Sequence, residues 1–101
     1  MKTHVAIPHH DYPTQVRETV AEKLLCLERY QDRVTNVQAT LGREKLDHRV
    51  ELVANVANGA TLVADVRRSA LSEALSEAVE RLVSQLRKVH GKSVDRRHGR
   101  L

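Results

Sequence analysis

The sequence predicts an α+β domain with the element order β-α-β-β-β-α, in which a four-stranded sheet carries both helices on one face. Two segments have apolar residues at helical spacing, and the segments around them alternate apolar and polar residues with the period of a strand. A chain of 101 residues is long enough for one such domain and too short for two. Because each strand has one apolar face and each helix one apolar stripe, we expect both helices on the same side of the sheet.

The first helix is predicted after a short strand at residues 2–7 and a polar turn that begins at Pro8. Asp11 or Thr14 is a suitable N-cap for this helix. Its apolar stripe consists of Val16, Val20, Leu24, Leu27 and Tyr30. Cys26 lies among the leucines, which favours a small buried hydrophobic residue over a reactive thiol.

Three strands are predicted after this helix. The period of two covers residues 34–41, ends at Gly42 and a charged loop, and returns at residues 49–56 and 62–67. Between the last two strands, Asn58-Gly59 is the strongest short hairpin signal, because both central residues of a type I′ turn need positive φ. The alternate polar positions predict a sheet face that the helices leave uncovered.

The second helix is predicted to begin after a Ser69 cap, to bury a stripe from Leu71 to Val89, and to end at Gly91. Residues 92–101 are basic and punctuated by glycine, and we expect a disordered tail there. The chain is therefore divided into a single domain over residues 1–91 and a basic tail over residues 92–101.

The charge of the chain is concentrated at its C-terminal end. Residues 1–80 hold 10 Lys/Arg against 12 Asp/Glu, whereas residues 81–101 hold seven basic residues against Asp95 alone. Such a patch suits a polyanion, and the alternative is a solvated tail that aids solubility. The chain has no apolar run long enough to span a membrane and no signal-peptide core. Its single cysteine excludes an internal disulfide, so we expect a cytoplasmic protein.

Catalytic motifs are missing from the sequence. It has no Gly-rich phosphate loop, no Gly-x-Ser-x-Gly and no paired-cysteine metal motif. His9-His10-Asp11 is the one histidine cluster, and a plain polar turn explains it better than a metal site, since neighbouring turn residues rarely converge on one ion. We therefore expect neither an enzyme nor a cofactor, metal or small-molecule substrate.

Basic residues on the two helices are the candidate RNA-binding residues. They are Lys23, Arg29, Arg33, Arg81, Arg87, Lys88 and Lys92. If the helices pack side by side, these cations form one continuous basic strip, with Arg81, Lys88 and Lys92 on a single flank of the second helix. Phosphate contacts of this kind favour structured RNA, because the chain lacks the aromatic residues of a single-strand stacking platform. Alternatively, Lys23 and Arg29 only pair with the neighbouring Glu22 and Glu28.

Two helix segments together resemble a known family. Residues 23–37, read as K-L-L-C-L-E-R-Y and R-V-T-N-V, are similar to the K-L-x-K-L-E-R-Y…R-V-x-x-V signature of the ribosome hibernation-promoting factors, also called ribosome-associated inhibitors, ribosomal subunit interface proteins or sigma modulation proteins. Residues 78–88, A-V-E-R-L-V-S-Q-L-R-K, are similar to the family's A-x-D-K-L-x-x-Q-L-x-K. The resemblance covers about residues 3–92.

The resemblance implies the β-α-β-β-β-α fold and a function. Members bind ribosomal RNA of the small subunit in the channel for messenger RNA and transfer RNA, and they inhibit translation during stress or stationary phase. Contacts with ribosomal RNA would carry over to Lys23, Arg29, Arg81, Lys88 and Lys92. The chain ends before the second domain of the long members, so it resembles a short form, and we expect a monomer when free.

Some positions depart from the family pattern. Cys26 replaces a basic residue, and Pro8-His9-His10 replaces a Gly-Arg pair. The D-M-Y-A-A-I-D entry to the second helix is A-L-S-E-A-L-S at residues 70–76, so Ala70, Ser72 and Ser76 stand in place of Asp, Tyr and Asp. Two other functions stay open: a double-stranded-RNA-binding module not tied to the ribosome, and a protein–protein regulatory module that uses the exposed sheet face.

Overall fold

The computed structural model describes residues 1–30 and 32–100, with side chains to residue 88, and it has the predicted β-α-β-β-β-α order. The strands are β1 (Lys2–Ala6), β2 (Val34–Glu44), β3 (Asp47–Val56) and β4 (Thr61–Arg68). The helices are α1 (Gln15–Leu24), the 3₁₀ helix η1 (Leu25–Tyr30) and α2 (Leu71–Arg100).

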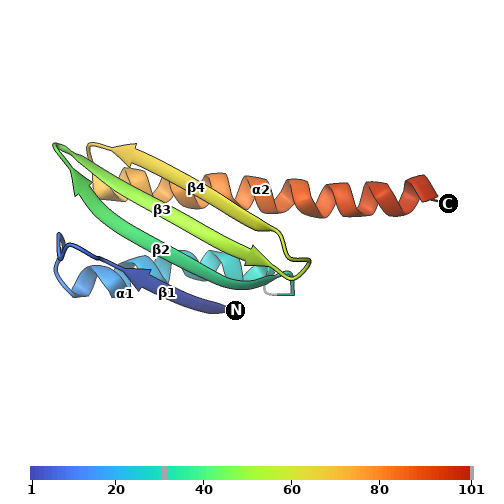
Figure 1. The fold of residues 1–101 in the computed structure, drawn as a ribbon, viewed down its shortest axis with the longest axis horizontal. Coiled ribbons are helices and arrows are strands. Elements are labelled where there is room, and N and C mark those ends of the chain that lie inside the picture. The colour runs from blue at the N-terminus through green and yellow to red at the C-terminus, as the bar shows by residue number, and fades with distance from the viewer. Residues whose placement is uncertain (31, 101) are drawn as a thin grey trace.

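The strands form one mixed sheet in the order β1-β2-β3-β4 (Figure 1). β1 pairs parallel to β2, with Val5 opposite Ala39, and the other two pairs are antiparallel. The parallel pair needs a crossover, which α1 and η1 provide. The β1 and β4 strands are the two edges of the sheet.

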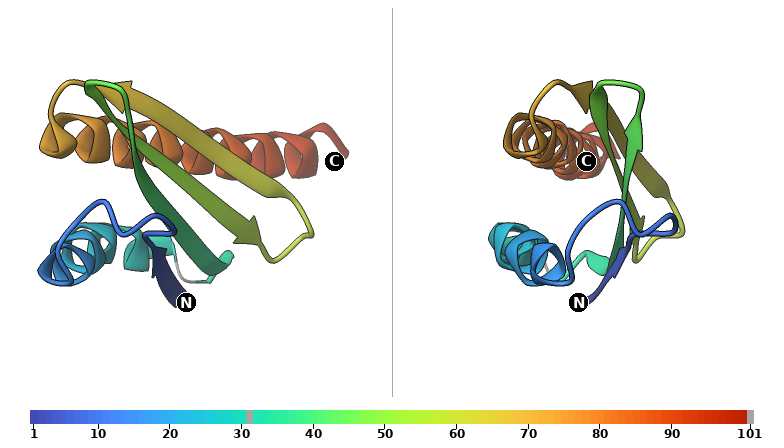
Figure 2. Two further views of the ribbon diagram at one scale, coloured as in Figure 1. Left: turned by 60° about the vertical axis from the view of Figure 1, so that its left-hand side comes forward. Right: turned by 90° about the vertical axis from the view of Figure 1, so that its left-hand side faces the viewer.

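Both helices lie on the same face of the sheet, as the sequence predicts (Figure 2). The core between the layers is made of Val, Leu and Ala side chains, with Ile7 and Tyr30 at its margin. Its largest fully buried side chains are Leu24, Leu27, Leu41, Leu52, Leu82 and Leu86. Among the described side chains no polar or charged residue is buried. Arg33 is half-buried, and five further candidate binding residues are exposed: Lys23, Arg29, Arg81, Arg87 and Lys88.

The first helix changes from α to 3₁₀ geometry at Leu25. A 3₁₀ helix has three residues per turn, so Leu24, Leu27 and Tyr30 point to the core one above the other, and all three are buried. Leu25 and Cys26 then face outward, and Leu25 is 56% exposed. The prediction that Cys26 is buried is therefore wrong: its thiol is exposed.

The two hairpins differ from the sequence prediction in detail. β2 continues through Gly42 to Glu44, and Lys45 takes positive φ in the turn. At Asn58-Gly59 the hairpin is confirmed, but among these residues only Gly59 has positive φ. The N–H of Gly59 donates to the Val56 carbonyl (2.9 Å) and the N–H of Val56 donates to the Ala60 carbonyl (2.9 Å). This is the three-residue loop with a glycine bulge, so the predicted type I′ turn is wrong.

The second helix is longer than the sequence predicts. Its backbone continues through Gly91 to Arg100, so the helix end predicted at Gly91 is wrong. Figure 1 shows the C-terminal half of α2 extending past the end of the sheet. The side chains from residue 89 onward, including Lys92, are outside the described set. The division into a domain over residues 1–91 and a basic tail over residues 92–101 stays a prediction.

Candidate nucleic-acid interface

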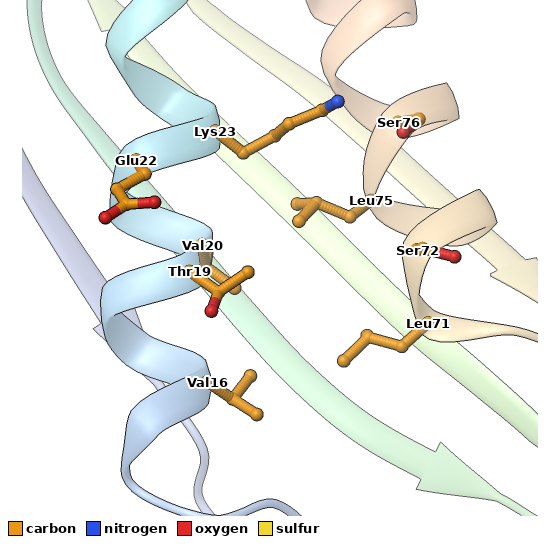
Figure 3. A pocket seen from close by; sticks show the side chains of 9 residues that line it. All are labelled: Val16, Thr19, Val20, Glu22, Lys23, Leu71, Ser72, Leu75 and Ser76. Carbon is orange, nitrogen blue, oxygen red and sulfur yellow. The ribbon is translucent and has the colours of Figure 1, made fainter.

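A groove runs between α1 and α2 on the helical side of the molecule (Figure 3). Its main part has a volume of about 470 Å³ and is floored by Val16, Val20, Leu71 and Leu75. It continues along the helices into a second hollow of about 360 Å³, beside Cys26, Val79 and Glu80. Ser72 and Ser76 stand on the flank of α2 that lines the groove.

Lys23 lies at the rim of this groove, at the end of α1. Figure 3 shows its side chain extending from α1 towards α2, on the side of Ser76, whereas the carboxylate of Glu22 points away from α2. Lys23 is exposed and forms no ion pair within the described part of the chain. The alternative interpretation, that Lys23 only pairs with Glu22, is therefore wrong. Its ammonium is available to an anion.

Arg29 and Arg33 are held at the junction of η1 and β2 by Tyr30. Their guanidinium carbons lie 5.9 Å and 5.5 Å from the centre of the Tyr30 ring, within the range of cation–π attraction. The carbonyl of Arg33 accepts a hydrogen bond from the N–H of Ala57 (2.6 Å), which joins the junction to the β3–β4 hairpin. Both cations thus lie close together beside Tyr30, next to the β3–β4 hairpin.

Arg81 differs from these cations because it has a counter-ion. Its guanidinium lies 2.7 Å from the Glu77 carboxylate one turn before it on α2, and Arg68 of β4 binds the same carboxylate. Four residues after Arg81, the Gln85 amide donates to the Val63 carbonyl of β4 (2.8 Å). These contacts show that the flank of α2 that carries Arg81 faces β4.

The predicted continuous strip is therefore wrong in its arrangement. Lys88 follows Arg81 by seven residues and so shares its flank beside β4, away from α1. The flank of α2 that faces α1 carries Ser72, Ser76 and Glu80 instead. Arg87 follows Glu80 by seven residues and so continues this second flank. Arg87 therefore lies on the flank of α2 that faces α1 and Lys23. Arg81 and Lys88 lie on the flank that faces β4. Lys92 cannot be placed, since its side chain is not described.

The uncovered face of the sheet is polar, as predicted, but its arginines are neutralised. Arg49 lies within 4 Å of three carboxylates, those of Glu44, Glu51 and Asp65. It donates two hydrogen bonds to Asp65, and these hold the pKa of that carboxyl below its usual range. Arg67 pairs with Glu44 (3.2 Å). A polyanion would have to displace these carboxylates, so this face is the weaker candidate for RNA.

The loop before α1 is built around Tyr12. Its hydroxyl lies 2.7 Å from His48 Nδ1 and 3.2 Å from the Gly42 carbonyl, and burial raises its pKa. The Asp11 carboxylate accepts the backbone N–H of Arg43 (3.0 Å). Asp11 thus fastens the His9-His10-Asp11 segment to β2. Nearby, Arg43 and Lys45 are exposed basic residues that the sequence analysis did not select, because their loop position gave no helical pattern.

The helical residues that differ from the family pattern lie along the groove. Ser72 and Ser76 line its main part, and Cys26 lies beside Ser76 in its continuation. Sequence reasoning placed these residues on two separate helices and could not show that they face one another. In this chain, small side chains occupy the rim positions where the pattern has a basic residue, a tyrosine and an aspartate.

Comparisons with known proteins agree with this architecture. A ribosome hibernation promoting factor from Azotobacter vinelandii is 31% identical over 99 residues, which is 98% of this chain and 92% of that protein. A protein of the same name from Pseudomonas putida is 30% identical over 88 residues, covering 87% of this chain and 85% of that protein.

Within the described part of the chain, every helix is too short or too polar to span a membrane.

Solved structures share the fold. A ribosomal subunit interface protein from Coxiella burnetii superposes with a TM-score of 0.80 and 20% identity, over 90% of this chain and 99% of that one. The N-terminal domain of protein Y from Thermus thermophilus superposes with a TM-score of 0.73 and 23% identity, over 88% and 99% of the two chains. The family model of sigma 54 modulation protein / S30EA ribosomal protein matches residues 4–94. The chain therefore belongs to the sigma 54 modulation protein / S30EA ribosomal protein family.

Proposed function

We propose that this protein is a ribosome hibernation factor. It binds ribosomal RNA of the small subunit in the channel for messenger RNA and transfer RNA, and it inhibits translation under stress or in stationary phase. The observation that carries the proposal is the family match over residues 4–94, together with relatives of about the same length named ribosome hibernation promoting factor. The protein acts in the cytoplasm, by occupancy and without catalytic turnover.

The distribution of unpaired charge supports the helical side as the RNA-binding side. Lys23, Arg29, Arg87 and Lys88 are exposed there and have no counter-ion among the described residues. On the opposite face Arg49 and Arg67 already hold carboxylates. Phosphates bind most readily to cations that do not first have to give up a carboxylate. Arg33 adds a further cation, and the Tyr30 ring lies beside both Arg29 and Arg33.

Inhibition follows from where such a domain would bind. Contacts with phosphates position a protein on RNA without reading its sequence, so selectivity comes from the shape of the RNA surface. A rigid domain seated in the channel excludes messenger RNA and transfer RNA by volume. Its inhibition is therefore stoichiometric and reversible by salt.

A double-stranded-RNA-binding module is the second candidate, because that domain has the order α-β-β-β-α. The feature against it is β1, which is paired in register with β2 over residues 2–6 and forms an edge of the sheet. Equal affinity for any RNA duplex and for small ribosomal subunits would favour this candidate over a hibernation factor.

Ribosome pelleting across a salt series tests the proposal. The wild-type protein should pellet with small subunits and should inhibit translation in a purified system at a one-to-one ratio. The logarithm of its affinity should fall linearly with the logarithm of salt concentration. Protein that stays in the supernatant at low salt would refute the proposal.

Charge variants show which side binds. Lys23→Gln combined with Arg29→Gln should reduce the salt slope by about two, about one for each lost phosphate contact. The matched control is Arg67→Gln, which removes one exposed but carboxylate-paired cation from the opposite face and should leave the slope unchanged. An unchanged slope in the double variant would favour the protein–protein regulator, in which basic residues only aid solubility.

A further inference from the structure

The groove between α1 and α2 combines an apolar floor, hydroxyl groups and a cation at one end. Its floor is apolar, formed by Val16, Val20, Leu71 and Leu75. Thr19 and Ser76 carry hydroxyl groups along its walls, whereas the hydroxyl of Ser72 points away from α1 (Figure 3). Lys23 extends over one end with no counter-ion among the described residues (Figure 3). Its volume of about 470 Å³ lies within the range of sites that hold small organic molecules.

We propose that this groove holds one unstacked nucleotide of the bound RNA. The base lies against the valine and leucine side chains, its polar edge meets the hydroxyl groups, and its phosphate contacts the Lys23 ammonium. This inference rests on the proposed function and adds a subsite to it. Bases of structured RNA that are extruded from loops and bulges are the ones that proteins bind in pockets.

The charge and position of the groove favour a nucleotide over an apolar protein segment. Lys23 provides a cation at the rim, and the carboxylate of the adjacent Glu22 points away from α2. Glu80 is the acidic residue on the facing flank, and it lies in the continuation of the groove and not in its main part. The groove is also continuous with the proposed RNA-binding side, since Arg29 follows on η1 and Arg87 continues the same flank of α2. A base in the groove would thus lie between cations that contact phosphates on either side of it.

Three small side chains stand along the groove and its continuation. Ser72, Ser76 and Cys26 stand at positions where the family pattern has larger or charged residues, and all three line the groove or its continuation. Filling these positions with aliphatic bulk would close the groove without changing any charge. This separates the proposed base contact from the phosphate contacts, because only the latter involve counter-ion release.

The first test is a groove-filling variant of the full-length protein, Ser72→Leu combined with Ser76→Leu. Its matched control is Ser84→Leu, which adds the same side chain to an exposed position of α2 outside the groove. The double variant should bind small subunits about tenfold more weakly, the loss expected for one buried base, with an unchanged salt slope. The control should bind like the wild type. Equal affinity of the double variant and the control would overturn the inference.

Comparing two binding targets shows whether RNA or a ribosomal protein occupies the groove. The same variants are measured against intact small subunits and against the protein-free RNA of that subunit. A nucleotide in the groove predicts the same loss of affinity for both targets. A loss confined to intact subunits would show that a ribosomal protein fills the groove, and would overturn the inference. If the wild-type protein binds neither target, it is the proposed function that fails.

The second test is photocrosslinking from Cys26, which uses the wild-type sequence and needs no substituted variant. Cys26 is the single cysteine, it is exposed, and it lines the continuation of the groove. A photoreactive group attached to its thiol should crosslink to one or two neighbouring nucleotides of the bound RNA. Crosslinking to a ribosomal protein alone would contradict the inference. Far-ultraviolet circular dichroism of the labelled protein controls for loss of structure.

Discussion

The side chain of Gln85 donates from Nε2 to the backbone carbonyl of Val63, 2.8 Å away, and so links α2 to the open edge of β4. The bond from Val56 N–H to the Ala60 carbonyl sets the alternation of the β3–β4 ladder, and this alternation turns the Val63 carbonyl away from β3. In the sheet formed by the described residues, β4 is an edge strand. The amide of Gln85 therefore occupies an acceptor that another chain could otherwise use.

Replacing Gln85 by methionine should weaken the domain and expose the β4 edge. The variant keeps the length of the side chain but lacks the donor, so the free energy of unfolding should fall by about 1 kcal/mol. Self-association should increase with concentration. Urea unfolding and light scattering measure the two effects. Ser84→Met is a control at an exposed neighbouring position, and equal behaviour of the two variants would contradict the prediction.

Glu77→Gln should strengthen RNA binding. The Glu77 carboxylate holds both Arg68 and Arg81, so its loss releases two cations for phosphate. We expect affinity for small subunits to rise by about threefold at low salt and the salt slope to steepen. The cost in stability should stay below about 1 kcal/mol, because the ion pairs are at the surface. Glu73→Gln on the same helix is the control, and an equal gain there would point to net charge alone.

The Arg49–Asp65 pair should make stability depend on pH in acid. Arg49 lowers the pKa of Asp65 in the folded protein, so the unfolded state binds more protons as the pH falls. The pair contributes fully to the free energy of unfolding above about pH 4, the ordinary pKa of an aspartate. This contribution is lost as the pH falls through the pKa of Asp65 in the folded protein. Asp65→Asn should therefore cost about 0.5 kcal/mol at pH 7. The difference from the wild type should narrow below pH 4, and a constant difference down to pH 2.5 would contradict this account.

Two glycines should respond in opposite directions to alanine. Gly59 has φ of +93°, so Gly59→Ala should lower the free energy of unfolding by about 1 kcal/mol through backbone strain, although space for the methyl group is open. Gly42 is in β2 without positive φ, and a methyl group there would make an ordinary contact 3.7 Å from Asp11 Oδ2. Gly42→Ala should raise stability by about 0.5 kcal/mol. Thermal unfolding of both variants checks the signs.

The fold could be predicted from the sequence because hydrophobic period is a local property. Alternating residues such as Leu52, Ala54 and Val56 define strands wherever they occur, and all four strands were found. The winding of a helix end is harder to predict. A stripe at Leu24, Leu27 and Tyr30 fits both α and 3₁₀ geometry, so the change at Leu25 was not predicted. Cys26 lies off this stripe in either geometry, and its apolar neighbours in sequence misled the prediction that it is buried.

The sequence predicted candidate RNA-binding residues but not how they are arranged. Helical spacing groups Arg81 with Lys88 on one flank of α2, but it cannot say which neighbour that flank faces. The contacts from Glu77 to Arg68 and from Gln85 to Val63 decide this, and they join residues distant in sequence. For the same reason the groove, which brings Cys26 to Ser76, has no signature in the sequence.

The parallel pairing of β1 with β2 has a consequence for the order of folding. β2, β3 and β4 are joined by short hairpins, so their pairing requires little loop closure and can form rapidly. β1 meets β2 only across the whole of α1 and η1, with Lys2 opposite Asn36. Closing that long loop has a larger entropic cost. We therefore expect the strand that leaves the translating ribosome first to join the sheet last.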